Sequence, residues 1–142
     1  MIKQQFTDAF TQFAREGIAR FKNVSPAGPA PRLSHVCFKF KNAEAYESYI
    51  TAARELGAVK QETFKGKQIS WCKLNAPLRK NELTLEWLEL VEPRFEQNDF
   101  DGVTSIGYCV PGLPEPIKIP LPGTPVVFRY QSQHAAELVK KT

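Results

Sequence analysis

Residues 33–40, LSHVCFKF, form the most regular pattern in the chain. One set of side chains is apolar and consists of Val36, Phe38 and Phe40, while the alternate set consists of His35, Cys37 and Lys39. Alternation with a period of two predicts a half-buried β-strand, because successive side chains of a strand point to opposite faces of its sheet. The apolar face must pack against a core layer. We expect the face that carries His35 to form the wall of a cavity rather than to meet open solvent.

Length and composition indicate a single globular domain. The chain has 142 residues, of which 42% are hydrophobic, enough for a core and too many for general disorder. No apolar run is long enough to span a membrane, and charges from Lys3 onward argue against a secretory signal. The odd number of cysteines, Cys37, Cys72 and Cys109, suggests free thiols and a cytoplasmic location. The net charge of +4 is scattered among acidic neighbours, so nucleic acid is not an expected partner.

The N-terminal segment predicts an amphipathic helix over residues 2–22. Its apolar positions recur every three to five residues, at Ile2, Phe6, Phe10, Phe13, Ile18 and Phe21. Such a helix could dock on a membrane or a partner, but we favour a helix that covers the sheet of its own domain. Three prolines and a glycine in SPAGPAP then predict a linker. We therefore divide the chain into a helical segment at 1–24, a linker at 25–32 and a main domain at 33–142.

The main domain mixes predicted strands and helices. Asn42 can cap a helix from Ala43 to Leu56, with Gly57 available for a left-handed C-cap. Strand-like runs follow at 58–64, 68–74, 82–91, 103–110 and 126–130, with a loop at 75–81 and at most a short edge strand near 117–119 in the proline-rich segment 111–125. One face of the run ELTLEWLELV carries Leu85, Trp87, Glu89 and Val91. Ser132 can cap a final short helix.

The order strand, helix, three strands resembles the vicinal oxygen chelate superfamily, which includes glyoxalase I, extradiol dioxygenases and bleomycin-resistance proteins. The resemblance depends on SHVCFKF around His35, WLELVEP around Glu89, GVTSIGYCV, and the C-terminal VVFRYQSQHAAELV. More narrowly, the chain resembles the bacterial YecM-type proteins, a group expected to bind metal. It implies an α+β fold with one βαβββ module and a shortened second module in a concave mixed sheet, flanked by N- and C-terminal helices. A cleft left open by the shortened module could be completed by a second chain, as a homodimer.

The resemblance also implies where a metal would be held. His35 and Glu89 match ligand positions, and Gln131 is a weak third candidate, whereas Ser105 and Arg129 occupy positions where a ligand would be expected. Imidazole and carboxylate groups bind Zn, Mn, Fe or Ni, and a working site usually needs three protein ligands. The cofactor is therefore expected to be either absent or a weakly held divalent metal.

Each of these residues also has a purely structural interpretation. His35 could be a satisfied polar side chain, and Glu89 could form an ion pair with Lys39 or Arg129. We predict a ligand pocket lined by Cys37, Lys39, Trp71, Trp87, Ser105, Cys109 and Arg129. The two tryptophans could equally belong to the core, and the two cysteines could be inert core thiols or substitute thiolate ligands.

Three functions fit these expectations. The first is a small-molecule binding protein of the vicinal oxygen chelate fold with a degraded metal site. The second is a divalent-metal-dependent lyase, isomerase or dioxygenase-like enzyme that uses His35 and Glu89. The third is a protein-interaction module that docks through the N-terminal helix. The missing third ligand favours the first function, and His134 is expected to be exposed and to have no role.

Overall fold

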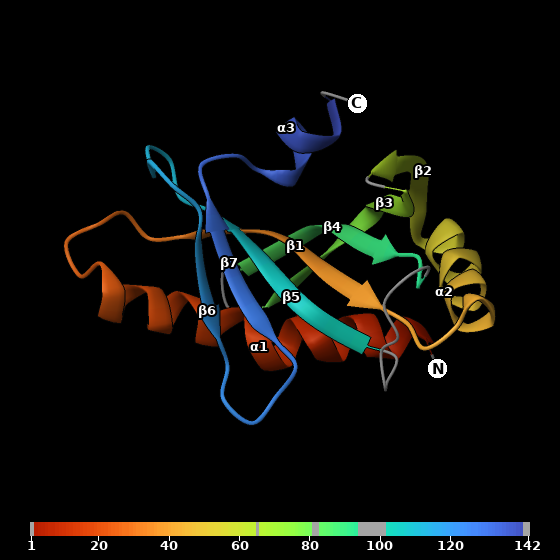
Figure 1. Ribbon diagram of the computed structural model, residues 1–142, viewed down its shortest axis with the longest axis horizontal. Coiled ribbons are helices and arrows are strands. Elements are labelled where there is room, and N and C mark those ends of the chain that lie inside the picture. Colours follow the sequence, from red (N-terminus) through yellow and green to blue (C-terminus); the bar gives the residue numbers. More distant parts are fainter. Residues whose placement is uncertain (1, 65, 81–82, 94–101, 141–142) are drawn as a thin grey trace.

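The computed structural model describes the chain except residues 1, 65, 81–82, 94–101 and 141–142. The described residues form an α+β fold in which one mixed sheet of seven strands is flanked by helices, in the order β2-β3-β4-β1-β5-β7-β6 (Figure 1). The helices are α1 (Ile2–Val24), α2 (Ala43–Leu56) and α3 (Ala135–Lys140). The strands are β1 (Arg32–Lys39), β2 (Gly57–Phe64), β3 (Lys67–Lys80), β4 (Leu83–Val91), β5 (Gly102–Cys109), β6 (Ile117–Pro120) and β7 (Val127–Gln131).

The strand that carries His35 lies at the centre of the sheet. β1 pairs in parallel with β4, and β3 pairs antiparallel with both β4 and β2. On its other side β1 pairs antiparallel with β5, which pairs in parallel with β7. The segment between β5 and β7 holds only the short β6 and turns, so the second half of the sheet is smaller than the first. Side chains from both halves therefore meet at β1.

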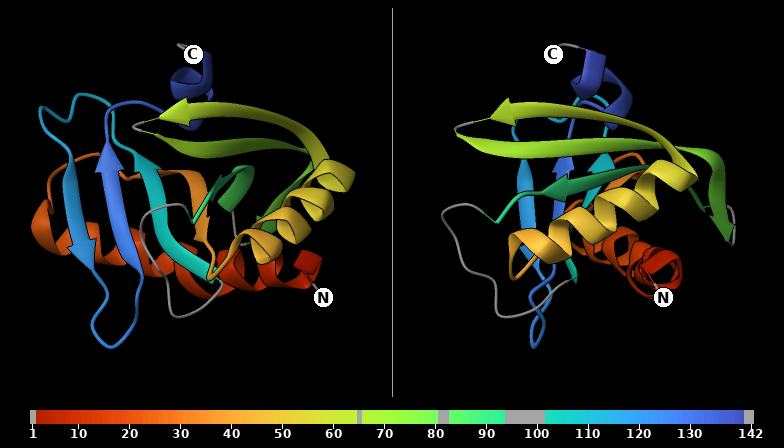
Figure 2. Two further views of the ribbon diagram at one scale, coloured as in Figure 1. Left: turned by 45° about the vertical axis from the view of Figure 1, so that its right-hand side comes forward. Right: turned by 90° about the vertical axis from the view of Figure 1, so that its right-hand side faces the viewer.

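Helix α1 covers one face of the sheet and shares its hydrophobic core. Phe6, Phe10 and Phe21 are each at most 3% exposed and pack with side chains from the sheet and α2. Two sheet tyrosines complete the contact, since the Tyr108 hydroxyl donates to the Ala14 carbonyl and the Tyr130 hydroxyl donates to that of Gly17. A short α3 lies away from α1, on the opposite face (Figure 2). We call this opposite face the α3 face.

The termini of α2 agree with the sequence prediction at one end only. Asn42 caps the helix, as predicted, because its side chain accepts a hydrogen bond from the Ala45 amide at 2.8 Å. The prediction of a left-handed cap at Gly57 is wrong, since its φ of −179° is extended. Glycine is required there for another reason. A Cβ would collide with the carbonyl oxygen of Lys73 on β3, so only glycine lets the two backbones approach this closely.

Two further predictions, both about β3 and β4, are wrong. The loop predicted at 75–81 is strand as far as Lys80, with a register shift between Lys73 and Leu78 where β3 pairs with β4. Leu85, which lies beyond this shift, is fully buried in the main core, whereas Trp87 belongs to a separate cluster with Trp71, so the two side chains do not share one face. The extra residues of the shift lie on β3, between Lys73 and Leu78.

Ser132 does not cap the last helix. Its residue is exposed, and its carbonyl accepts a hydrogen bond from the Cys109 thiol at 3.4 Å. The first amide of α3, that of Ala135, instead donates to the hydroxyl of Ser34 on β1 at 2.7 Å. The helix is therefore attached to the central strand by a side chain far away in the sequence.

Candidate functional site

The His35 side chain lies on the α3 face, pressed against the neighbouring strand. Its Cα partner on β5 is Gly107, and a Cβ built on that glycine would lie 2.8 Å from both ring nitrogens. The indole of Trp71 contacts the ring from β3 in an edge-on arrangement, with centroids 5.1 Å apart. His35 is only 6% exposed. Glycine on one side and tryptophan on the other therefore fix the plane of the imidazole.

Both ring nitrogens of His35 have polar neighbours. The Ser34 hydroxyl lies 3.0 Å from Nδ1, and Glu89 Oε1 lies 3.5 Å from Nε2. Because the Ser34 oxygen already accepts from the Ala135 amide, its hydrogen can be donated to Nδ1, which leaves the Nε2 hydrogen facing Glu89. The pKa of His35 is lowered to about 4. Burial is the main cause, and the nearby His134 and Arg129 contribute to the same shift. The imidazole is therefore neutral at neutral pH.

Glu89 lies beside His35 on β4 and is largely withdrawn from solvent. Burial raises the pKa of its carboxyl group, while a hydrogen bond from the Cys37 thiol and the positive charges of Arg129 and Lys39 act in the opposite direction. Burial and the Glu89 charge in turn raise the pKa of the Cys37 thiol. The Cys37 sulfur is thus a protonated hydrogen-bond donor at neutral pH and not a thiolate.

Helix α3 covers the apolar side chains next to this pair. Trp71, Trp87, Ala135 and Val139 form a second hydrophobic cluster, separate from the main core, which we call the α3 cluster. The Trp71 indole donates to Glu62 Oε1 at 2.7 Å, whereas the buried Trp87 Nε1 has no hydrogen-bond partner among the described residues. The two tryptophans therefore pack beneath the chain's own C-terminal helix.

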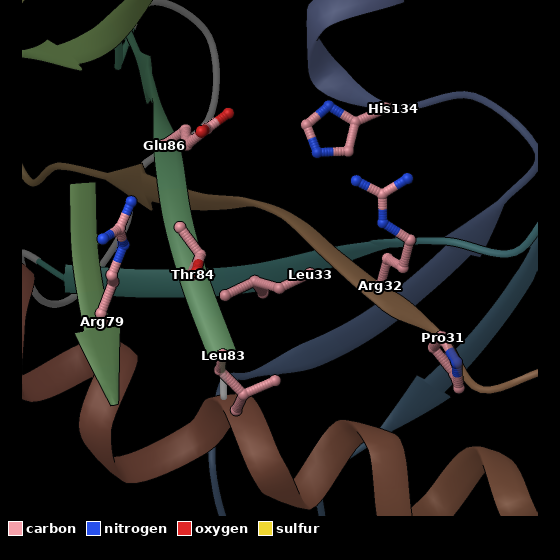
Figure 3. A pocket seen from close by; sticks show the side chains of 8 residues that line it. All are labelled: Pro31, Arg32, Leu33, Arg79, Leu83, Thr84, Glu86 and His134. Carbon is pink, nitrogen blue, oxygen red and sulfur yellow. The ribbon is translucent and has the colours of Figure 1, made fainter. Parts of the chain in front are cut away.

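A cavity of about 420 Å³ is lined by residues of β1, β3 and β4 and by His134, which directly precedes α3. We call it the β1–β4 cavity, and Figure 3 shows its lining side chains, Pro31, Arg32, Leu33, Arg79, Leu83, Thr84, Glu86 and His134. Arg32 and His134 lie together on one side of it, with Arg79 on the other and Leu33 and Thr84 between them (Figure 3). Its size is that of a small-molecule site.

The predicted pocket residues do not line the β1–β4 cavity. This holds for all seven, namely Cys37, Lys39, Trp71, Trp87, Ser105, Cys109 and Arg129. Two of them, Trp71 and Trp87, pack against α3 instead. Ser105 is buried opposite Cys37 in the β1–β5 pairing, and Arg129 is exposed on β7.

The described residues do not fit a tightly held divalent metal. His35 and Glu89 are brought together, but the described residues contain no group of three His, Cys, Asp or Glu side chains that could hold a metal ion. Gln131 lies on β7 and pairs with Cys109 on β5, four residue pairs along the strands from Ser105. The Cys37 thiol, held protonated by burial, is a poor substitute ligand. The set thus offers two donors where a catalytic site uses three.

Sequence reasoning missed the cavity residues. Arg32 is the last residue of the predicted linker, Arg79 falls in the predicted loop, and His134 was given no role. His134 is half-buried, and its Nδ1 accepts a hydrogen bond from the Ala136 amide at 3.2 Å, so it caps α3. No local pattern marked these residues, and Arg79 falls on a strand only because β3 extends to Lys80.

Comparison with known proteins supports the fold alone. No family model matches the sequence, and no curated protein matches it significantly. Among solved structures, a protein described as "Structural Genomics, Protein EC4020" is similar over 97% of this chain and 91% of its own length. The TM-score is 0.71 and the sequence identity is 16%, so the two chains share an architecture. Among the described residues, no helix is long and apolar enough to cross a membrane.

Proposed function

We propose that this protein is a small-molecule binding protein of the vicinal oxygen chelate kind, which holds its ligand in the β1–β4 cavity without a bound metal. The strand order supports the class. In the first half of the sheet, β1, α2, β2, β3 and β4 follow one another as a βαβββ unit with β1 parallel to β4, and β5, β6 and β7 form a shorter second unit. The YecM-type proteins remain the group that the sequence resembles most narrowly.

The β1–β4 cavity is the observation that carries this function. It has a volume of about 420 Å³, and its lining combines the apolar side chains of Leu33 and Leu83 with charged groups. Apolar surface supplies affinity in such sites, while a few placed polar groups orient the ligand. The enzyme alternative depends on a metal held by His35 and Glu89, and this pair has two donors, is buried, and lies beneath α3 rather than in the cavity.

A cavity-filling substitution tests the function. Thr84 lies on β4 within the cavity lining, so Thr84→Phe should occupy part of the space that a ligand needs. Thr63→Phe on β2 is the matched control, because Thr63 is exposed and does not line the cavity. We expect members of a library of neutral, cationic and anionic metabolites to raise the melting temperature of the unaltered protein and of Thr63→Phe, but not of Thr84→Phe. Equal shifts in all three proteins would show that the ligand binds elsewhere.

A further inference from the structure

The basic side chains of the β1–β4 cavity define the class of ligand. Resting on the proposed function, we infer that the cavity takes a small organic anion, a carboxylate or a phosphate monoester, held between Arg32, Arg79 and His134. Two guanidinium groups face the cavity against one carboxylate, that of Glu86. Among the described residues no ion pair joins Glu86 to either arginine. The cavity therefore keeps a net positive charge.

Arg32 and Arg79 suit an anion because of their geometry as well as their charge. A guanidinium group presents a planar fork of N–H donors that matches two oxygens of a carboxylate or phosphate. Arg32 begins β1 and Arg79 lies near the end of β3, and the two approach the cavity from different sides (Figure 3). A bound anion therefore has a guanidinium group on each side of the cavity.

His134 supplies a third donor through its contact with α3. Because its Nδ1 accepts the hydrogen bond from the Ala136 amide, the hydrogen of the neutral ring is on Nε2. His134 lines the cavity beside Arg32 (Figure 3), so an N–H donor is available next to the guanidinium group. Glu86 lines the same space and would accept a hydrogen bond from a hydroxyl or amino group of the ligand. The preferred ligand is thus an anion that also carries such a donor.

The same histidine connects the cavity with the tryptophans. His134 directly precedes α3, and Ala135 and Val139 of that helix contact Trp71 and Trp87. These are the two tryptophans of the chain, so the whole indole fluorescence arises from the α3 cluster. An anion that binds His134 should therefore change tryptophan fluorescence, which gives a direct readout of binding in the cavity.

The test titrates succinate, glycerol 3-phosphate and inorganic phosphate, with succinamide, glycerol and putrescine as neutral and cationic counterparts. Calorimetry and tryptophan fluorescence report binding to the full chain. We expect the organic anions to bind, and Arg32→Gln and Arg79→Gln each to weaken them about tenfold or more, because each removes charge-assisted hydrogen bonds. Arg54→Gln is the matched control, since Arg54 is exposed on α2 and does not line the cavity.

Each other result has one meaning. If succinamide binds as tightly as succinate, or if both cavity variants bind anions as well as Arg54→Gln does, the inference about anions is overturned while the small-molecule function stands. If inorganic phosphate binds as tightly as glycerol 3-phosphate, the site is a phosphate site and the organic part of the inference is wrong. If no compound of any charge binds, both the inference and the proposed function fail.

Discussion

The imidazole of His35 lies directly on the backbone of Gly107, its pairing partner on the neighbouring strand. Any larger residue at this position would place its Cβ in the volume of the ring. Gly107 has no positive φ that would explain the glycine, so space alone requires it. The absence of a side chain at Gly107 thus leaves room for the buried imidazole between β5 and Trp71.

Substitution of Gly107 should reveal this contact. Gly107→Ala should lower the free energy of unfolding by about 1–3 kcal/mol, the usual cost of overpacking a tightly packed site. In a His35→Ala background the same change should be neutral or stabilising, because the ring is gone and alanine is favoured over glycine within a strand. Urea denaturation of the four proteins measures the coupling. Equal costs in both backgrounds would show that the ring does not occupy this space.

The pH dependence of stability should report the buried imidazole. The pKa of His35 is lowered from 6.5 to about 4, so as the pH falls the unfolded chain binds the proton first. The free energy of unfolding should therefore decrease from about pH 6.5 down to pH 4, by up to about 3 kcal/mol from this group. Glu89 acts in the opposite sense, because its raised pKa lets the folded state take up a proton first and offsets part of the loss.

The comparison of variants isolates the His35 contribution. His35→Gln should be less stable than the unaltered chain at pH 7.5, and the difference should shrink as the pH falls to 4. The other histidine serves as the control, and His134→Gln should retain most of the decrease. Chemical denaturation at half-unit intervals of pH measures both curves. Parallel curves for His35→Gln and the unaltered chain would contradict a buried neutral imidazole.

In helix α1, replacing Gly17 by alanine should destabilise the protein, which is the opposite of the usual effect of this replacement in a helix. Within a helix, replacing glycine by alanine usually adds about 1 kcal/mol of stability. At Gly17 a Cβ would meet the ring of Tyr108, 2.5 Å from Cζ, so we expect Gly17→Ala to lose about 1–3 kcal/mol instead. Ala19→Gly, on the exposed side of α1, should show the ordinary preference and lose about 1 kcal/mol. A higher melting temperature for Gly17→Ala would show that α1 does not press on the tyrosines.

Much of the first half of the fold follows from local sequence, and the departures have a physical cause. The alternation around His35 predicts β1, and Asn42 predicts the start of α2, because both signals are local. Pairing shifts are not local, and the one between Lys73 and Leu78 lies in the segment that was predicted to be a loop. The candidate pair of His35 and Glu89 could be predicted from the resemblance, but the packing of helix α3 beside it could not.

The position of helix α3 and the β1–β4 cavity both depend on contacts between segments that are distant in the sequence. Ser34 caps α3 from about a hundred positions away in the sequence, and no pattern within either segment announces the contact. The cavity combines Arg32, Arg79 and His134 from three separate parts of the chain. A seven-strand sheet order must be known before these three can be placed on one face.

Metal affinity distinguishes the two functions considered for this protein, a metal-free binding protein and an enzyme that uses a metal held by His35 and Glu89. The unaltered chain should bind Zn weakly, because two donors without a third lose the chelate geometry that holds a metal. Ser105 pairs with Cys37 on one side, and Cys37 pairs with Glu89 on the other, so the three lie in a row across the sheet. A histidine at position 105 would thus stand one strand away from Cys37 and two strands away from Glu89.

Ser105→His should therefore raise the affinity for Zn by roughly 10–100-fold, the size of effect that even outer-shell partners of a metal exert. Calorimetric titration at pH 7.5 measures it, and the circular dichroism spectrum must stay unchanged, since Ser105 is buried and a larger side chain costs stability. The control is His35→Ala in the Ser105→His background, which should abolish the gain. Tight binding of Zn by the unaltered chain would overturn the metal-free function, because it would require donors beyond His35 and Glu89. If the gain in Zn affinity persists without His35, the new histidine does not act together with the His35–Glu89 pair, and the expected arrangement of position 105 beside that pair is wrong.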